Sequence, residues 1–183
     1  MTRATAMTNR LGLLLTAALL ASACKRDQPE QSSPTTTVVT FDGIGRARIG
    51  ATLAQLRDAG PVPDTPAGQA TGQTACRFVK LDWLPSGTRV MLASDTVARI
   101  DVDSTSTVKT IDGATVGDSE ARLHQLYPRV ETQPHKYVTN GHYLIVASPN
   151  DSTRRLVFET DGNTVKAFRV GRRPEVDFVE GCG

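Results

Sequence analysis

The sequence predicts an α+β fold made of two related units, each a short helix followed by an antiparallel β-meander. Three observations support this prediction: an internal repeat, a helix start and stop at the beginning of each copy, and short β-rich runs after each helix. Helices followed by runs of strands are typical of the α+β class. We expect a single globular domain over residues 41–183, with repeats over about 44–111 and 112–180.

An export signal is expected at residues 1–23, ahead of this domain. Arg3 and Arg10 come first, and an apolar run that ends in small side chains follows them. That order is typical of a secretory signal peptide. The run is shorter than the roughly 20 residues that a membrane-spanning helix requires.

Cys24 follows the signal directly and resembles the acylated cysteine of the bacterial lipoprotein lipobox, although Ala21 stands where Leu is usual. The resemblance implies lipid attachment at Cys24. Because Lys25 rather than Asp follows, it also implies delivery to the outer membrane, with the protein facing the periplasm. The alternative is ordinary cleavage after Ala23, which would leave Cys24 as a free thiol.

A disordered tether is expected between the signal and the domain, over residues 24–40 with the acylated cysteine at its start. This stretch is polar, contains Pro29 and Pro34, and has almost nothing to bury before Val38. A segment with so few apolar residues cannot bury enough apolar surface to offset the conformational entropy lost on folding.

The charge of the chain excludes one class of partner. The 183 residues include 21 Lys and Arg against 19 Asp and Glu, a formal net charge of +2. Arg3 and Arg10 supply this excess, so the chain without its signal is formally neutral. Nucleic-acid binding depends on a basic surface, and we therefore expect no nucleic-acid partner.

The globular part of the chain repeats itself. Residues 49–56 align with residues 116–123 at an offset of 67 residues. With one residue inserted, residues 97–102 align with residues 165–170. Self-similarity of this period indicates one supersecondary unit used twice, and chance similarity is the alternative.

Each copy is expected to begin with a helix of about two turns. Thr52 and Gln55 can form a capping box at the first helix, and Ser119 or Asp118 can cap the second. Pro61 and Pro128 end the helices, because proline disfavours the helical conformation at the residue before it. Helices this short must pack on a sheet to persist.

Short β-rich runs, separated by turn residues, follow each helix. The runs of the first copy are 75–81, 89–93, 97–103 and 107–111, and those of the second are 142–148, 154–160, 164–170 and 175–180. Asp161-Gly162 between two of these runs indicates a β-hairpin.

The two repeat openings carry a resemblance to a known family. They read Arg48-Ile49-Gly50-Ala51-Thr52 and Thr115-Val116-Gly117-Asp118-Ser119. They resemble the Ile-x-x-Gly-Met-Thr-like openings of the β-lactamase-inhibitory-protein-like fold, which small outer-membrane assembly lipoproteins of the BamE type also use. Ala51 and Asp118 replace the frequent Met. The resemblance spans roughly residues 44–180 and implies a fold and an export route, not an activity.

Cys76 and Cys182 remain once Cys24 is acylated. An even pair in an oxidising compartment is expected to form a disulfide. Closing a loop of about 100 residues contributes on the order of 4–5 kcal/mol in the chain-entropy model. The alternative is a reactive thiol or a metal ligand.

A candidate binding surface consists of residues near the expected turns: Trp83, His135, Tyr137, His142 and Tyr143. Exposed aromatic rings anchor protein interfaces and also stack on sugars, although Trp83 can equally cap the core. His135 and His142 flank a glycine turn, but a metal centre needs three or four converging ligands. We therefore expect no metal site and no cofactor.

The chain carries no catalytic motif that we can identify. Gly-x-Ser-x-Gly is absent, and Gly43, Gly45 and Gly50 lack the spacing of a dinucleotide loop. We expect a non-enzymatic lipoprotein that acts as a protein-binding or assembly module in the periplasm, in contact with the membrane through its lipid. The alternative is a lectin-like lipoprotein that binds carbohydrate or peptidoglycan.

Replacement of Cys24 tests the lipid anchor. We expect Cys24→Ser to release the protein from membranes, because each buried CH2 of an acyl chain contributes about 0.8 kcal/mol to anchoring. Fractionation and immunoblotting measure the change, with Ser22→Ala as the control that keeps the thiol. An unchanged distribution of the Cys24→Ser protein would contradict the anchor.

Overall fold

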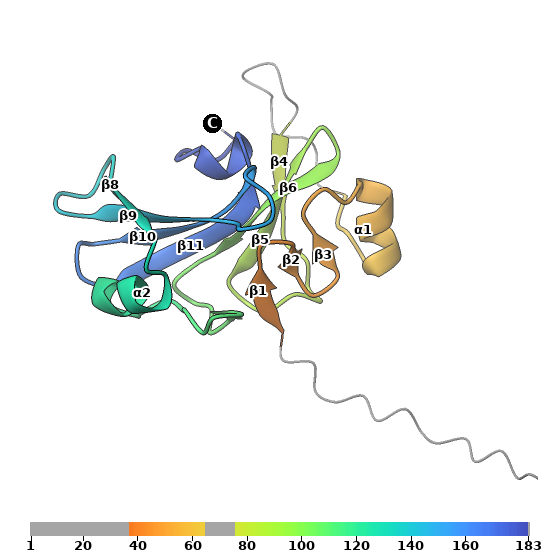
Figure 1. Ribbon diagram of the computed structural model, residues 1–183. Helices are drawn as coiled ribbons and strands as arrows, with labels where there is room; N and C mark the ends of the chain where they lie inside the picture. The colour runs from red at the N-terminus through yellow and green to blue at the C-terminus, as the bar shows by residue number, and fades with distance from the viewer. Residues whose placement is uncertain (1–36, 65–75, 183) are drawn as a thin grey trace, which may run out of the picture. The chain divides into compact units, whose positions relative to one another are not determined.

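Two β-sheets dominate the structure, a computed structural model that describes residues 37–64 and 76–182. The large sheet has seven strands in the order β4-β5-β6-β11-β10-β9-β8, and the small sheet has four in the order β3-β2-β1-β7 (Figure 1). All neighbours in the large sheet are antiparallel. The expected signal, Cys24 and most of the expected tether lie outside the described residues.

The strands are short and fall largely where alternating or apolar runs occur. The large sheet contains β4 (Cys76–Val79), β5 (Thr88–Ala93), β6 (Thr96–Val102), β8 (Glu131–Pro134), β9 (His142–Ala147), β10 (Arg154–Thr160) and β11 (Val165–Arg172). The small sheet contains β1 (Val38–Thr40), β2 (Gly43–Ile44), β3 (Ala47–Arg48) and β7 (Lys109–Thr110). The helices are α1 (Leu53–Ala59), α2 (Glu120–Leu126) and the 3-10 turn η1 (Glu175–Asp177).

The expected α+β class is wrong, because the described residues form a β-rich fold. Residues 37–64 and 76–182 contain eleven strands and only two α-helices, each 7 residues long. The two expected meanders also do not stand as separate units. Strand β6 pairs with β11, with Ile100 opposite Val170, so strands from both halves form one continuous sheet.

Three segments differ from the expected strands. Residues 38–40, placed in the tether, form β1, and Lys109–Thr110 join β1 in the small sheet instead of extending the meander. Residues 131–134, outside the expected strands, form the edge strand β8. Residues 175–180 were expected as a strand and instead contain η1. Among these segments, only the parallel pairing of β1 with β7 joins distant parts of the chain, since β8 pairs with the next strand, β9, across a hairpin.

The two helices begin with the same local geometry. Gly50 and Gly117 both have positive φ, 90° and 88°, which L side chains rarely adopt. The Gly50 N–H donates to the Val97 carbonyl at 2.7 Å, and the Gly117 N–H donates to the Val165 carbonyl at 2.9 Å. Each helix start is thereby joined to the first residues of β6 or β11.

The capping expectations at these helices are confirmed. Thr52 and Gln55 form a complete capping box at α1, and the Ser119 hydroxyl accepts from the Arg122 N–H at α2. Leu56 and Leu123 are the fully buried residues of the two helices. Among the described residues, no helix has the length and apolarity that crossing a membrane requires.

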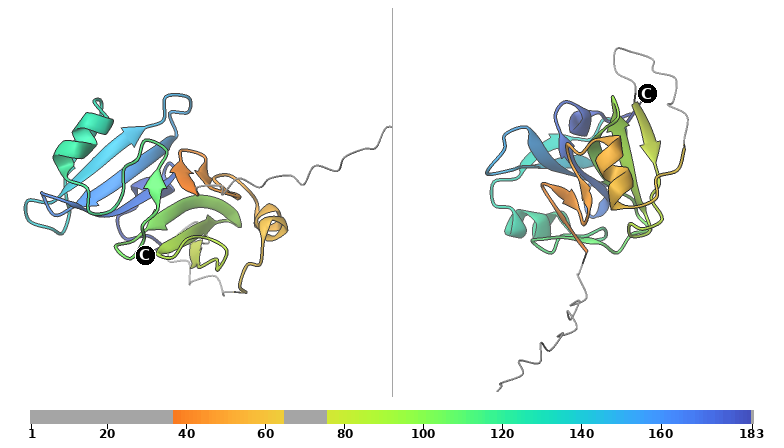
Figure 2. Two further views of the ribbon diagram at one scale, coloured as in Figure 1. Left: turned by 90° about the horizontal axis from the view of Figure 1, so that it is seen from below. Right: turned by 90° about the vertical axis from the view of Figure 1, so that its right-hand side faces the viewer.

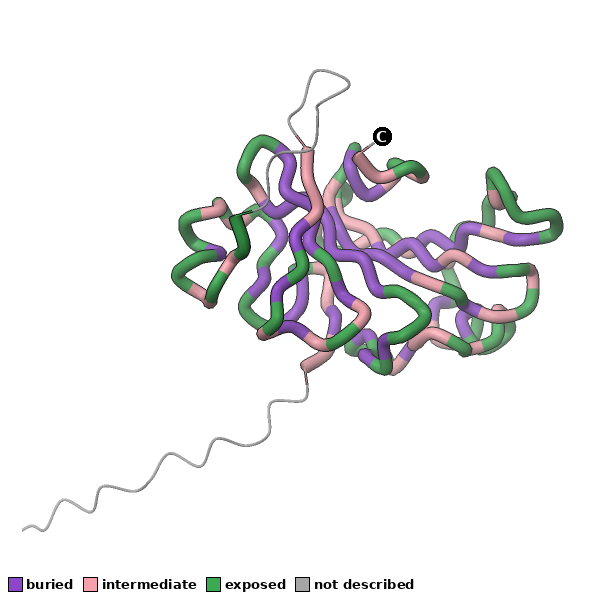
Figure 3. The backbone as a smooth tube through the Cα atoms, turned by 180° about the vertical axis from the view of Figure 1, so that it is seen from behind, coloured by how far each residue is buried: buried purple, intermediate pink, exposed green. Residues whose placement is uncertain are grey.

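The main hydrophobic core lies against one face of the large sheet. Helix α2 and the small sheet lie on this side, whereas η1 lies on the opposite side (Figures 1 and 2). Phe158 is central to the core, with ring centroids 5.7 Å from Tyr127 and 5.3 Å from Phe168. The central strands are buried along much of their length, and exposure concentrates at turns and hairpin tips (Figure 3).

The opposite face of the large sheet, which we call the outer face, carries a second and smaller hydrophobic cluster. It consists of Tyr143, Ile145, Val157 and Val176, with Val179 packed against it. Residues 173–182, the C-terminal segment, supply Val176 and Val179. A disulfide between Cys76 and Cys182, with Cα atoms 5.5 Å apart, joins the end of this segment to β4.

Two buried arginines on the outer face hold the backbone of the C-terminal segment. Arg99 on β6 donates to the carbonyls of Glu175 and Phe178, at 3.3 and 2.5 Å. Arg169 on β11 donates to the Val176 carbonyl at 2.6 Å. The segment has little regular structure of its own, so the sheet supplies donors for carbonyls that its single 3-10 turn leaves free, those of Val176 and Phe178.

Replacement of Arg169 should destabilise the fold strongly. Arg169→Met leaves the buried Val176 carbonyl and the half-buried Glu159 carboxylate without the Arg169 donor, and leaving such groups unsatisfied costs about 1–3 kcal/mol. Lys166→Met on the same strand removes only an exposed ion pair, so its cost should be below about 1 kcal/mol. Urea unfolding measures both free energies, and equal losses would contradict the role of Arg169.

Candidate functional site

The candidate site is a cavity on the outer face of the large sheet. It has a volume of about 370 Å3 and lies among strands β8 to β11 and the C-terminal segment. Four cationic side chains line it: Lys136, Arg155, Arg169 and Arg173. Its apolar wall is the second hydrophobic cluster, through Tyr143, Ile145, Val157 and Val179.

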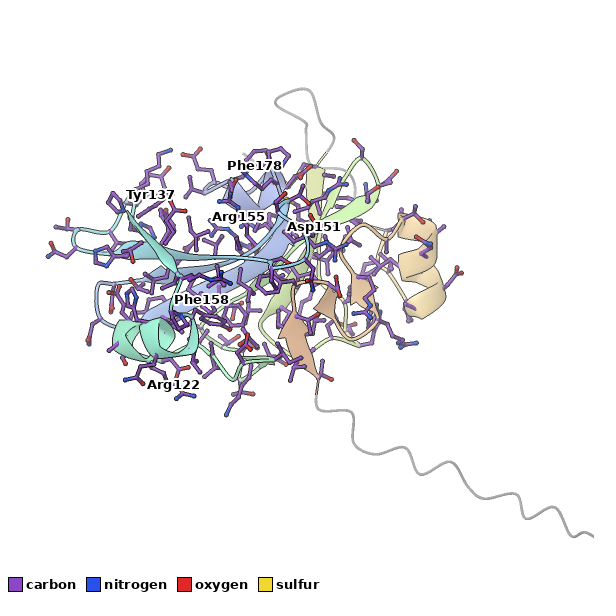
Figure 4. The ribbon with its side chains drawn as sticks, in the orientation of Figure 1. Arg122, Tyr137, Asp151, Arg155, Phe158 and Phe178 are labelled. Carbon is purple, nitrogen blue, oxygen red and sulfur yellow. A yellow bond between two sulfur atoms is a disulfide. The ribbon has the colours of Figure 1, made fainter. Side chains whose placement is uncertain are left out.

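Strand alternation explains why these side chains share one face. Successive residues of a strand point to opposite faces of the sheet, so Arg155, Val157 and Glu159 of β10 face outward while Leu156 and Phe158 enter the core. Figure 4 shows Arg155 on the same side of the sheet as Tyr137 and Phe178, and Phe158 on the side of α2.

A smaller cavity of about 140 Å3 lies beside the first, on the side of β5 and β6. Arg169 and Val179 line both cavities. Arg99 and Asp101 also line the smaller one, and they form a buried ion pair with each other. Burial lowers the pKa of Arg169, and the neighbouring Arg99 guanidinium lowers it further, against the opposite effect of Glu159.

His135 and Tyr143 form a stacked pair at the edge of the large cavity. Their ring centroids are 4.4 Å apart with an interplanar angle of 20°. The His135 Nε2 lies 3.8 Å from a Glu159 carboxylate oxygen, and Glu159 also pairs with Arg169. Burial raises the pKa of the Tyr143 phenol, and the Glu159 charge contributes in the same direction.

The loop between β8 and β9 is joined to the C-terminal segment by polar contacts. Lys136 Nζ lies 2.7 Å from a Glu180 carboxylate oxygen, and the Tyr137 hydroxyl donates to the same oxygen. These hydrogen bonds, that of Lys136 first, lower the pKa of Glu180. The loop and the segment therefore flank the cavity as a connected rim.

His142 does not belong to this site. Its Nδ1 lies 2.8 Å from a carboxylate oxygen of Glu120 on α2, on the core side of the sheet. His135 lies on the outer face, so the two histidines do not converge. Within residues 37–64 and 76–182, no group of three or more His, Cys, Asp or Glu side chains could hold a metal ion.

Trp83 also lies apart from the cavity, in the connection between β4 and β5. Its indole Nε1 donates to the Pro61 carbonyl at 2.9 Å, and the Arg46 guanidinium lies 5.2 Å from the ring centroid. A Cβ on Gly60 would meet indole atoms at 2.6 to 2.9 Å, so the ring packs closely on the end of α1. Trp83 therefore caps the core.

The structure thus brings together three of the five sequence-predicted surface residues: His135, Tyr137 and Tyr143. It adds the cationic residues, Asp177 and the C-terminal segment, which the sequence reasoning missed. The sequence did contain one signal for a charged outer face: Arg155 and Glu159 lie at alternate positions of an otherwise apolar strand. The position of the segment over the sheet had no comparable local signal.

The lining of the cavity combines polar and apolar side chains. Its polar side chains are Gln133, Tyr143, Asp177 and the four cations. A cavity with an apolar wall and a few polar groups is typical of a ligand site.

Comparisons of the chain with protein-family models, with curated protein sequences and with solved structures give no match. The resemblance of the two helix openings to the β-lactamase-inhibitory-protein-like family therefore depends on those short motifs alone.

The contact between Lys136 and Glu180 makes a pH-dependent prediction. Because the folded-state pKa of Glu180 is lowered, its contribution to stability is complete above the pKa of an unfolded Glu, about 4.3. That contribution is lost as the pH falls through the lower, folded-state pKa. Carboxyl NMR titration of Lys136→Met should show the Glu180 pKa returning towards its ordinary range.

Lys166→Met is the matched control, because Lys166 pairs with Asp161 and not with Glu180. This variant should leave the Glu180 titration unchanged. An identical Glu180 pKa in the unmodified protein and in Lys136→Met would contradict the assigned contact.

Proposed function

We propose that the protein is a non-enzymatic lipoprotein of the cell envelope that binds a protein partner through the outer face of its large sheet. The observation that carries this proposal is the cavity of about 370 Å3 beside the C-terminal segment, with cationic side chains and an apolar wall. Its volume is within the range of about 300–1,000 Å3 that is common for ligand sites.

The exposed residues at the rim of the cavity support a protein partner. Tyr137 is 61% exposed and Phe178 is 43% exposed, and both are large apolar side chains on the outer-face side (Figure 4). Tyr, Phe and Arg are enriched at protein interfaces relative to the rest of a protein surface. The rim and the cationic lining together contain all three residue types.

The aromatic rings are poorly arranged for stacking on sugars, which disfavours the lectin-like alternative. A sugar needs an open aromatic face. The ring of Tyr143 is stacked on His135, and that of Trp83 is covered by Gly60 and Arg46. Lys136 lies 5.0 Å from the centroid of the Tyr137 ring.

An envelope location is part of the proposal. The signal at residues 1–23 and Cys24 support export and anchoring, with the outer membrane and the periplasm as the expected destination. The disulfide between Cys76 and Cys182 supports an oxidising compartment, because such bonds persist there and are rare in the cytosol.

In-cell photocrosslinking tests the proposed function. A photoreactive residue is placed at Tyr137, at Phe178 and, as a control, at Ile111, which is 64% exposed but follows strand β7 of the small sheet. We expect one envelope protein to be captured from the first two positions and not from the third. The captured protein should then bind the purified mature chain carrying Cys24→Ser in calorimetry.

Two results would contradict the proposal. One is the lack of a shared adduct at Tyr137 and Phe178. The other is saturable binding to a glycan array or to peptidoglycan that is lost in Trp83→Ala, since that result would favour the lectin-like alternative.

A further inference from the structure

We propose that the large cavity binds the carboxyl terminus of a polypeptide whose last side chain is apolar. This inference rests on the proposed function, since it names the part of a protein partner that the outer face recognises. The cavity combines a cation that has no carboxylate within hydrogen-bond distance and an apolar wall, within one volume of about 370 Å3.

The charges that meet at the cavity do not cancel. Lys136 pairs with Glu180, and Arg169 pairs with Glu159. Arg155 and Arg173 share a single carboxylate, that of Asp177. Four cations are thus balanced by three carboxylates, and the excess of one positive charge belongs to the pair that shares Asp177.

Arg155 is the cation with the weakest pairing. Asp177 lies 2.7 Å from Arg173 but 3.9 Å from Arg155, beyond hydrogen-bond distance. The Arg155 Nε is also buried without a hydrogen-bond partner. A half-buried guanidinium with a buried, unpaired Nε and no carboxylate within hydrogen-bond distance gains most from a carboxylate supplied by a ligand.

The apolar wall lies directly against this charge. Val157 is two residues from Arg155 on the same face of β10. Ile145 of β9 lies directly opposite Val157 in the sheet. A ligand that fits must therefore carry its anionic group within a few bonds of an apolar group. The last residue of a polypeptide has this form, because its carboxylate and its side chain share one Cα.

The size of the excess charge favours a carboxylate over a phosphate. A carboxylate carries one negative charge and is planar, which matches the guanidinium fork of arginine. A phosphate monoester carries about −1.5 to −2 at neutral pH, more than the single excess positive charge of the cavity. Capture of a terminal carboxylate is also a recurring mode of peptide recognition.

NMR titration of the mature chain carrying Cys24→Ser tests the proposal with short peptides. The probes are acetyl-Gly-Gly-Leu as the free acid, the same peptide as its amide, and acetyl-Gly-Gly-Ser as the free acid. We expect saturable shifts of the Tyr143, Ile145 and Val157 amides with the first peptide. The other two should bind at least tenfold more weakly, because each lacks one of the two features.

Neighbouring arginines on β10 provide a matched pair of variants. Arg154 and Arg155 have similar side-chain exposure, 24% and 19%, but Arg154 pairs with Asp42 and Asp151 and does not line the cavity. Arg155→Gln should weaken binding of the Leu peptide at least tenfold, and Arg154→Gln should leave it unchanged. If Arg155→Gln does not fold, Arg173→Gln replaces it, because Arg173 is exposed.

Several outcomes would overturn the proposal: equal binding of acid and amide, equal weakening by Arg154→Gln and Arg155→Gln, or binding of decanoate or inorganic phosphate in place of the peptide. The crosslinking experiment distinguishes failure of the carboxyl-terminus proposal from failure of the proposed function. A partner captured at Tyr137 and Phe178 through an internal segment would leave the proposed function standing and exclude recognition of the carboxyl terminus.

Discussion

The hydrogen bonds from Arg99 and Arg169 to the backbone of residues 173–182 are the interaction on which the outer face depends. The segment contains one short 3-10 turn, in which the Asp177 and Phe178 N–H groups donate to the Pro174 and Glu175 carbonyls, whereas the Val176 and Phe178 carbonyls accept from side chains of the sheet. The guanidinium groups supply the donors, and the disulfide between Cys76 and Cys182 joins the far end to β4. Without these contacts the second hydrophobic cluster would lose its cover and the cavity one wall.

The buried arginines also connect the fold to the candidate site. Each has a carboxylate partner, Asp101 for Arg99 and Glu159 for Arg169, as buried charges require. Glu159 in turn lies beside the stacked His135, so the network reaches the rim of the large cavity. The same charges that hold the C-terminal segment therefore shape the electrostatic field in which a ligand would bind.

The local features of this chain could be predicted, and the pairing of its central strands could not. Strands 142–147 and 154–160 and the caps at Thr52 and Ser119 follow from alternation and hydrogen-bonding side chains. The pairing of β6 with β11 joins residues about 70 positions apart, such as Ile100 and Val170. The repeat aligned these two strands as equivalent copies, but similarity between copies does not say that they pair with each other. The expectation of separate α+β units failed at this pair. The prediction that His142 belongs to the binding surface was wrong for a similar reason. Its side chain lies on the core side of the sheet, where it contacts Glu120 of α2.

Residue chemistry and neighbours within a few positions were enough to predict the helix starts and the cysteine pair, and they also carry the expectation of an export signal and of a neutral chain behind it. The position of residues 173–182 over the outer face, and the absence of a carboxylate within hydrogen-bond distance of Arg155, follow from the tertiary fold. The physical reason is that burial and ion pairing are set by which distant strands meet. The charge of Arg155 was visible in the sequence, but its incomplete pairing appears only where β10 meets the C-terminal segment.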